Sequence, residues 1–274
     1  MNEKNNTILL NNGVTMPTLG LGVFKIGDGK PVKDVVSYAL KNGYRAIDTA
    51  SVYGNEKGVG EGIRDSGVKR ENIFVTSKVF THEMGYQETL EAYNRSLDKL
   101  QLSYLDLYLV HWPKEGKYLE TYRALVDLYK DGKVKAIGVS NFQISHLKAL
   151  MENFDVLPSV NQIELHPLLQ QLELRNFCTL NNIATIAWSP LMKGALDIPL
   201  LKEIGKKYAK SAAQVTLRWH LQNNIIVIPK SVHFSYIKEN ADIFDFMLSE
   251  EEMEKIASLN QDKRFGPDPD NFDF

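Results

Sequence analysis

The sequence predicts an α/β protein, and three observations favour a (β/α)8 barrel of the TIM type. Short apolar runs typical of strands alternate with amphipathic stretches typical of helices over almost the whole chain, which is the pattern of parallel β-α-β units. The strand-like runs number eight. Polar residues recur at their C-terminal ends, and in a barrel those ends meet on the face that carries the active site.

The composition is that of a soluble globular protein. The 274 residues are 43% apolar and 24% charged, and a single barrel domain can span 1–274. A net charge of −2 gives no reason to expect nucleic acid or an anionic membrane as a partner. Met1–Asn6 is polar without an apolar leader, and no stretch is long enough to span a membrane, so we expect a cytoplasmic protein. Cys178 is the only cysteine, which excludes an internal disulfide, and we expect it to pack in a helix.

The two ends of the chain carry their own signals. Asn11-Asn-Gly13 between the apolar runs 7–10 and 14–16 predicts a β-hairpin that covers one end of the core. Ser249 and Glu252 form a possible capping box for a last helix. The tail 266–274 holds too many helix breakers for a helix, so we expect a surface loop.

Between these ends the strands and helices follow one another regularly. Each strand candidate is a short apolar run, and each helix candidate shows the helical period. Strands are expected at 18–21, 46–48, 73–78, 105–111, 136–139, 159–162, 184–188 and 225–229. Helices are expected at 32–42, 88–100, 121–130, 144–153, 171–181, 211–222, 237–244 and 250–258.

The stretch from Asp48 to Tyr53 is the first candidate site, because it places a carboxylate and a phenol on one rim of the sheet. Lys78 ends the next strand, where its ammonium loses hydration unless a carboxylate lies beside it. Asp48 is the nearest candidate. A Lys78–Asp48 pair beside Tyr53 would lower the tyrosine pKa from about 10 and make the phenol a proton donor near neutral pH.

His111 closes a third strand, and a neutral imidazole there can donate a hydrogen bond to a carbonyl oxygen. Each of these residues alone is weak evidence. A strand-end lysine is often a structural ion pair, and a lone histidine is more often a satisfied core residue. Together, the four groups on successive strands indicate a catalytic site.

Six spaced motifs resemble those of one enzyme family, the aldo-keto reductases, and stand in that family's order. They are Asp48-Thr-Ala-Ser-Val-Tyr53-Gly-Asn-Glu, Thr76-Ser-Lys78, Leu107-Tyr-Leu-Val-His111-Trp-Pro, Gly138-Val-Ser140-Asn141-Phe, Asn161-Gln162-Ile-Glu and Ile228-Pro-Lys230-Ser231. The resemblance runs from about Leu10 to the C-terminus. Within the family, Ala187-Trp188-Ser-Pro-Leu and the ending Gly-Pro-Asp-Pro-Asp-Asn-Phe-Asp-Phe are similar to the bacterial branch that contains methylglyoxal and 2,5-diketogluconate reductases.

The resemblance implies an NADPH-dependent reductase of small aldehydes and ketones, such as methylglyoxal, other dicarbonyls and keto-sugars. Tyr53 would be the general acid, with Asp48 and Lys78 as the pair that tunes it. His111 would orient the substrate carbonyl. The implied substrate pocket is lined by Phe24, Phe80, His111 and Trp112. Family members of this type are often monomers.

The same resemblance implies where the coenzyme lies. Ser140, Asn141 and Gln162 would hold the nicotinamide carboxamide, and Trp188 would stack on the ring. The loop after the seventh strand would follow the pyrophosphate, Lys230 and Ser231 would hold the adenosine 2′-phosphate, and Glu239 and Asn240 would contact the adenine. The full implied set is Gly22, Val23, Asp48, Ser140, Asn141, Gln162, Trp188, Ser189, Leu191, Lys193, Lys230, Ser231, Val232, Tyr236, Glu239 and Asn240.

Two features modify this expectation. The family usually carries an arginine five residues after Ser231, and this chain has Tyr236, which brings no charge to a phosphate. We therefore expect NADPH with weaker discrimination against NADH than the family norm. The loop Lys114–Tyr118 is short, so we expect an open substrate pocket.

Three other functions fit parts of the sequence less well. Tyr53 and Lys57 also fit the Tyr-x-x-x-Lys pair of short-chain dehydrogenases, but neither Gly20-Leu-Gly22 nor the glycines of 58–62 complete a dinucleotide loop. A regulatory NADPH-binding barrel with little turnover is opposed by the intact set of four catalytic candidates. A metal-dependent hydrolase would need clustered ligands, and none of the six histidines is paired at ligand spacing.

Overall fold

The computed structural model describes residues 7–274, and the centre of the molecule is a parallel β-barrel. The strands from β3 to β10 pair in chain order, each parallel to its neighbour. Three backbone hydrogen bonds close the barrel between residues 18–22 and 227–229. Gly20 donates to the Val227 carbonyl at 2.8 Å, Val227 donates to the Thr18 carbonyl at 2.9 Å, and Gly22 donates to the Pro229 carbonyl at 3.1 Å. The strands are β3 (Leu21–Gly22), β4 (Ala46–Asp48), β5 (Phe74–Val79), β6 (Leu105–Val110), β7 (Val134–Ser140), β8 (Val160–Glu164), β9 (Ala184–Trp188) and β10 (Ile226–Val227).

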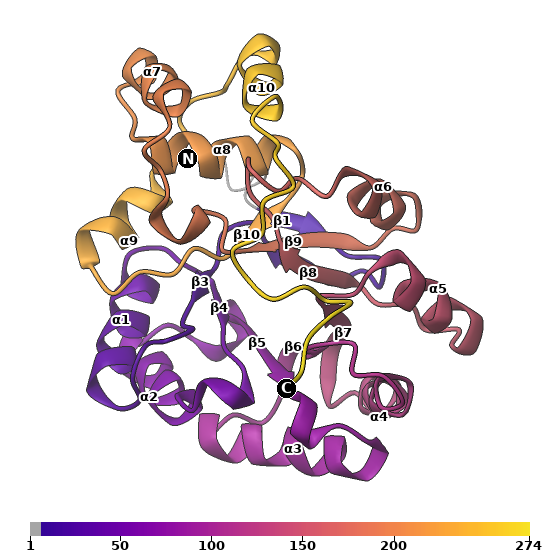
Figure 1. The fold of residues 1–274 in the computed structure, drawn as a ribbon. Coiled ribbons are helices and arrows are strands. Elements are labelled where there is room, and N and C mark those ends of the chain that lie inside the picture. Colours follow the sequence, from indigo (N-terminus) through magenta and orange to yellow (C-terminus); the bar gives the residue numbers. More distant parts are fainter. Residues whose placement is uncertain (1–6) are drawn as a thin grey trace.

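Helices surround the strands on the outside of the barrel (Figure 1). Their apolar faces pack on the outward side chains of the strands and form one large core with them. The helices are α1 (Lys30–Lys41), α2 (Glu56–Ser66), α3 (Tyr86–Leu100), α4 (Tyr118–Lys130), α5 (Ile144–Asn153), α6 (Leu172–Leu180), α7 (Pro199–Tyr208), α8 (Ala212–Gln222), α9 (Phe234–Ala241) and α10 (Glu250–Ala257).

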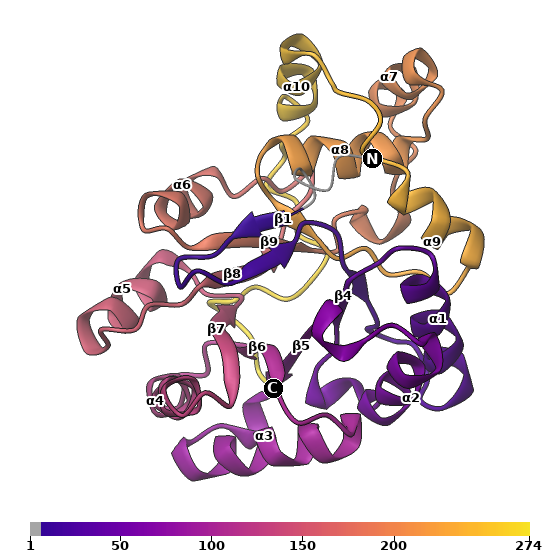
Figure 2. The same cartoon turned by 180° about the vertical axis from the view of Figure 1, so that it is seen from behind.

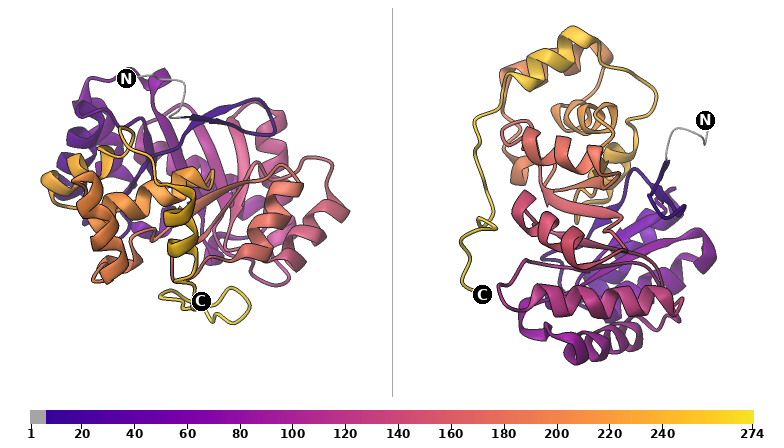
Figure 3. Two further views of the ribbon diagram at one scale, coloured as in Figure 1. Left: turned by 90° about the horizontal axis from the view of Figure 1, so that it is seen from above. Right: turned by 90° about the vertical axis from the view of Figure 1, so that its right-hand side faces the viewer.

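The two ends of the barrel are covered by different parts of the chain. The hairpin of β1 (Thr7–Leu9) and β2 (Thr15–Pro17) crosses one end (Figure 2). Leu10 and Met16 from this hairpin pack against side chains inside the barrel, such as Phe74. The segment after α10 crosses the opposite end, where the C-terminal ends of the strands lie (Figure 3). The predicted barrel, hairpin and tail are thus all present.

The expected elements are confirmed with small shifts of their ends. The strands at 46–48 and 184–188 and the helix at 144–153 have the predicted bounds. The helix expected at 237–244 lies three residues earlier, at Phe234–Ala241. The capping box of α10 is present, because the Ser249 hydroxyl accepts from the Glu252 amide and the Glu252 carboxylate accepts from the Ser249 amide. The closed barrel excludes the open sheet of a short-chain dehydrogenase.

Helices α2 and α7 were not among the predicted helices, and α2 shows why. Its glycines lower the intrinsic helix propensity, so the local sequence does not predict a helix at this position. They lie instead where helices touch closely: a Cβ on Gly58 would stand 2.4 Å from Val32, and one on Gly60 would stand 2.0 Å from the Leu100 carbonyl oxygen. The requirement for glycine comes from tertiary contacts that the local sequence does not show.

The remaining expectations concern Cys178, the start of the chain and membrane-spanning helices. Cys178 is fully buried in α6, and burial raises the pKa of its thiol to about 11, which suits packing rather than reactivity. The expectation for Met1–Asn6 lies outside the described residues. Among residues 7–274, no helix is long and apolar enough to cross a membrane.

The contact at Gly60 predicts an unusual response to alanine. In an exposed helix, glycine to alanine stabilises by about 1 kcal/mol. Here the new methyl group would collide with the backbone of Leu100, so Gly60→Ala should lower the free energy of unfolding by about 1–3 kcal/mol. Urea denaturation should show a lower midpoint with an unchanged m value. Gly27→Ala is the control, because its Cβ meets nothing within 4 Å. A Gly60→Ala midpoint at or above that of the wild type would contradict the argument.

Candidate active site

A buried ion pair lies at the C-terminal end of the barrel. Asp48 ends β4 and Lys78 lies near the end of β5, so neighbouring strands bring them together. The Lys78 Nζ donates to Asp48 Oδ1 at 2.5 Å and to the Thr49 carbonyl at 2.9 Å. Burial lowers the pKa of Lys78, and the charge of Asp48 opposes that shift. The pair expected from the sequence is present, and the Lys78 side chain has no surface exposed to solvent.

Tyr53 lies beside this pair, at the end of the short helix η2 (Ser51–Tyr53) that follows β4. Its ring centroid is 5.2 Å from the Lys78 Nζ, and it is 5.8 Å from the ring of His111. Burial and the charge of Asp48 raise the pKa of Tyr53 well above its usual value of about 10. The expected lowering of this pKa is therefore wrong for this structure, because burial disfavours the phenolate and the negative charge of Asp48 adds to that effect.

His111 follows β6 and faces Tyr53 across the site. Its side chain is 6% exposed, and its Nδ1 has no hydrogen-bond partner among residues 7–274. Burial, reinforced by the charge of Lys78, holds the pKa of His111 well below its usual value of 6.5. The imidazole is therefore neutral at physiological pH, as the sequence led us to expect, and its unpaired nitrogen leaves capacity to bind a polar ligand.

Amide side chains connect the ion pair to the neighbouring strands. Gln162 Nε2 donates to the second oxygen of Asp48 at 2.7 Å, and the Ser140 hydroxyl donates to the Gln162 carbonyl at 2.9 Å. Asn141 Nδ2 donates to the His111 carbonyl at 3.0 Å, while Asn141 Oδ1 accepts from the Trp188 indole at 2.8 Å. The three residues predicted for a carboxamide thus lie together with the catalytic candidates in one hydrogen-bonded group.

Two lysines lie at the other positions predicted for phosphate. Lys193 lies in a loop after β9 where both Ser189 and Lys193 adopt left-handed backbone angles, and its Nζ donates to the Phe265 carbonyl at 2.5 Å. Lys230 follows β10, is exposed, and makes no ion pair within the described part of the chain. Ser231 is buried beside it. A free ammonium next to a hydroxyl suits an anionic group such as phosphate.

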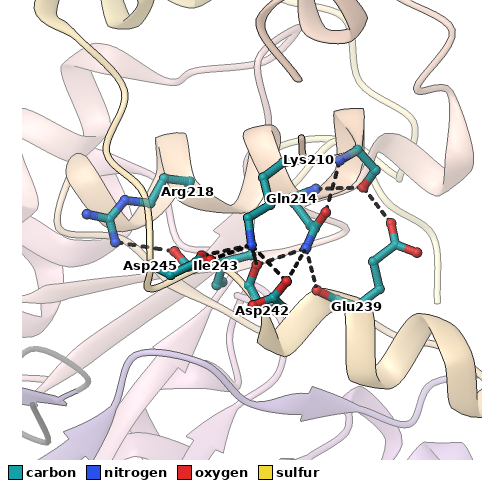
Figure 4. Close-up of polar contacts among 8 residues, drawn as sticks. Lys210, Gln214, Arg218, Glu239, Asp242, Ile243 and Asp245 are labelled. Atoms are coloured by element: carbon teal, nitrogen blue, oxygen red, sulfur yellow. Dashed lines mark hydrogen bonds and ion pairs between the residues drawn. The ribbon is translucent and has the colours of Figure 1, made fainter. Parts of the chain in front are cut away.

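The residues predicted to contact adenine lie on α9, and Figure 4 shows how that helix is fixed. The Glu239 carboxylate accepts from the Ser211 hydroxyl at 2.5 Å, and the Glu239 carbonyl accepts from Gln214 at 3.2 Å. Lys210 pairs with Asp242 at 2.7 Å just beyond the helix. These contacts hold α9 against the start of α8, while Tyr236 on its outer side is 55% exposed.

Two aromatic residues of the tail were missed by the sequence analysis. The ring of Phe274 stacks on Phe80 at 5.6 Å, and the ring of Phe272 lies 5.1 Å from Trp112. Lys114 Nζ also donates to the Phe274 carbonyl at 3.2 Å. The tail therefore packs on Phe80 and Trp112, two of the residues predicted to line the substrate pocket. Two phenylalanines in an otherwise polar tail were the available signal.

A cavity elsewhere in the molecule and the described His, Cys, Asp and Glu side chains point to no second site among the predicted residues. A cavity of about 470 Å³ lies at the hairpin end of the barrel, between residues 8–11, Arg175 and Asn223, and none of the predicted site residues lines it. Residues 7–274 hold no group of three or more His, Cys, Asp or Glu side chains placed to bind a metal ion. The catalytic candidates gather only at the opposite end.

Comparisons with known proteins agree with this geometry. A family model described as the aldo/keto reductase family matches residues 18–261. The chain is 55% identical to the glyoxal reductase of Bacillus subtilis over 269 residues, 98% of each chain. It is 45% identical to the methylglyoxal reductase DkgA of Escherichia coli K12 over 270 residues, 97% of each chain. The crystal structure of a Bombyx mori aldo-keto reductase in complex with NADP superposes with a TM-score of 0.91 at 35% identity, covering 96% of this chain and 95% of that one.

The neutral, buried His111 predicts how stability depends on pH. Unfolded histidine binds a proton near pH 6.5, whereas folded His111 stays neutral well below that pH. The unfolded state therefore gains protons as the pH falls from 7 to 5, and stability falls by up to about 1.4 kcal/mol per pH unit for this residue. In His111→Asn that contribution disappears, so urea unfolding at several pH values should show a shallower decline.

The control for this experiment is His82→Asn, which removes an exposed imidazole from the same face. It should keep the decline of the wild type. Parallel pH profiles for the wild type and His111→Asn would show that His111 titrates alike in the folded and unfolded chains, and would contradict the assignment of a neutral buried imidazole.

Proposed function

The chain belongs to the aldo/keto reductase family, and we propose that it reduces small aldehydes and ketones, dicarbonyls such as methylglyoxal among them, with NADPH. The observation that carries the proposal is the buried Lys78–Asp48 pair beside the ring of Tyr53, with the ring of a neutral His111 5.8 Å from that of Tyr53. Relatives named for glyoxal and methylglyoxal reduction support the substrate class.

The residues present fit a nicotinamide coenzyme. Bound NADPH would supply the hydride. Trp188 offers an indole ring fixed at its nitrogen by Asn141, which suits stacking on a flat heterocycle. Ser140 and Gln162 supply polar groups beside it, and Lys230 offers an ammonium without an ion-pair partner among the described residues. The NADP complex of the Bombyx mori relative supports the same coenzyme.

Tyr53 is proposed as the general acid of the reduction. Because burial and Asp48 raise its pKa, the phenol keeps its proton at neutral pH and is ready to donate it. As the proton leaves, negative charge develops on the phenol, and the ammonium of Lys78 stabilises it. The neutral imidazole of His111 orients the carbonyl oxygen toward the phenol by a hydrogen bond. Asp48 keeps Lys78 in place without touching the substrate.

The proposed coenzyme preference rests on Lys230 and Ser231. Both lie just after β10, where one positive charge and one hydroxyl can meet the 2′-phosphate. Tyr236 lies in the first turn of α9, exposed, with its ring 5.4 Å from that of His233. It can stack or donate one hydrogen bond, but it adds no charge. We therefore propose that NADPH is preferred over NADH by a narrow margin.

Loss of the Tyr53 hydroxyl tests the reaction and the acid together. Tyr53→Phe should lower the rate of NADPH consumption with methylglyoxal by roughly two to four decades, because the proton donor is gone while the ring remains. NADPH binding should persist. Tyr86→Phe removes an exposed phenol elsewhere and should leave turnover unchanged. Near wild-type turnover in Tyr53→Phe would refute the assignment, whereas bound NADPH without turnover in any variant would favour a regulatory NADPH-binding protein.

An added charge at position 236 tests the coenzyme assignment. Tyr236→Arg should raise the ratio of kcat/KM for NADPH over NADH about ten- to a hundredfold, because a hydrogen bond to a charged group contributes about 1.5–3 kcal/mol. Tyr236→Phe is the matched control, which keeps the ring and should leave the ratio almost unchanged. A lower KM for NADH than for NADPH in the wild type would refute the preference. An unchanged ratio in Tyr236→Arg would show that the phosphate binds elsewhere.

A further inference from the structure

A short segment of backbone lies directly against the indole of Trp188. It consists of residues 264–266, here named the strap, and belongs to the connection that crosses the active end of the barrel after α10 (Figure 1). Gly266 makes the contact: a Cβ at this position would stand 2.3 Å from Trp188 Cη2. The indole therefore has room on this side only because residue 266 has no side chain.

Glu164 holds the strap in this position. It ends β8, its side chain is 1% exposed, and its carboxylate accepts from the Phe265 amide at 2.7 Å and the Gly266 amide at 3.0 Å. His166 lies 3.2 Å from the same carboxylate. A buried carboxylate is costly unless its oxygens are hydrogen-bonded, and here two consecutive backbone amides satisfy it. On the other side of the strap, the Phe265 carbonyl accepts from Lys193.

The opposite edge of the indole is fixed as well. Trp188 Nε1 donates to Asn141 at 2.8 Å, and Asn141 is itself held by the His111 carbonyl. An amide at the five-membered ring and the strap at the six-membered ring therefore hold the indole in one orientation. The carboxylate of Glu164 binds the two consecutive amides of the strap that lie next to the ring.

We propose that Glu164 and Gly266 are positioning residues for the coenzyme: the carboxylate fastens the strap, and the strap holds the Trp188 indole in the orientation that stacks on the nicotinamide. This inference rests on the proposed function, because it takes Trp188 as the stacking partner. It assigns a role to Glu164 and Gly266, two residues of the quoted stretches for which the resemblance implied no role in the site.

The first test is Gly266→Ala. The backbone of Gly266 lies outside the left-handed region, so alanine fits the chain, and its methyl group must displace the indole. NADPH should bind about two- to tenfold more weakly, which is the span expected for one aromatic stacking contact. Fluorescence titration measures that affinity, and the indole emission of the coenzyme-free protein should shift as well. Gly27→Ala is the control, because its Cβ is free of contacts.

The second test removes the fastening. Glu164→Gln replaces a carboxylate oxygen with an NH₂ group that cannot accept from a backbone amide. The amides of Phe265 and Gly266 should exchange with deuterium faster in this variant without coenzyme, and NADPH should again bind more weakly. Thermal melts establish that both variants are folded. If one of them fails to fold, the other carries the test.

A double-mutant cycle separates positioning from general loosening. In the Trp188→Ala background, Gly266→Ala and Glu164→Gln should no longer weaken NADPH binding, because the group they position is absent. Additive losses, or wild-type affinity in both single variants, would overturn the inference. If Trp188→Ala itself leaves the affinity unchanged, the stacking role fails and this inference fails with it. Failure of the wild type to bind NADPH would instead refute the proposed function.

Discussion

The buried ion pair between Lys78 and Asp48 is the interaction on which the rest of the site depends. An ammonium buried in the protein interior is destabilised by several kcal/mol unless a carboxylate and further hydrogen bonds compensate it. Asp48 uses one oxygen for Lys78 and the other for Gln162, and the Gln162 carbonyl in turn accepts from Ser140. The pair therefore ties together the ends of four strands, β4, β5, β7 and β8, and fixes the face on which ligands would bind.

The same pair shapes the electrostatics of the phenol. A free ammonium beside Tyr53 would favour the phenolate, but burial penalises the charged form of the phenol, and the negative charge of Asp48 disfavours it further. The consequence is a phenol that holds its proton, next to a cation that is already paired. Such an arrangement is suited to giving a proton to a carbonyl oxygen, because the ammonium acts on the charge that develops during transfer.

The sequence predicted the parts of the molecule that local patterns encode. The strand-end residues were identifiable because parallel strands in a barrel must end on one face, which brought Asp48, Lys78 and His111 together. Helix α2 was missed because its glycines are required by close contacts with α1 and α3, which the local sequence does not show. The packing of Phe272 and Phe274 on Trp112 and Phe80 depends on where a long irregular segment folds back. The pKa of Tyr53 depends on burial, which no motif records.

One irregular segment contacts residues of both the proposed coenzyme wall and the proposed substrate wall of the site. Residues 264–266 lie against Trp188, and a few residues later Phe272 and Phe274 pack on Trp112 and Phe80. The coenzyme wall and the substrate wall are thus joined by a short stretch of backbone rather than only by the barrel. A barrel strand moves little without disrupting its neighbours, whereas an irregular segment held by a few hydrogen bonds has more freedom. The hydrogen bonds that the Phe265 and Gly266 amides donate to Glu164 therefore matter, because they tie this irregular segment to strand β8 of the barrel.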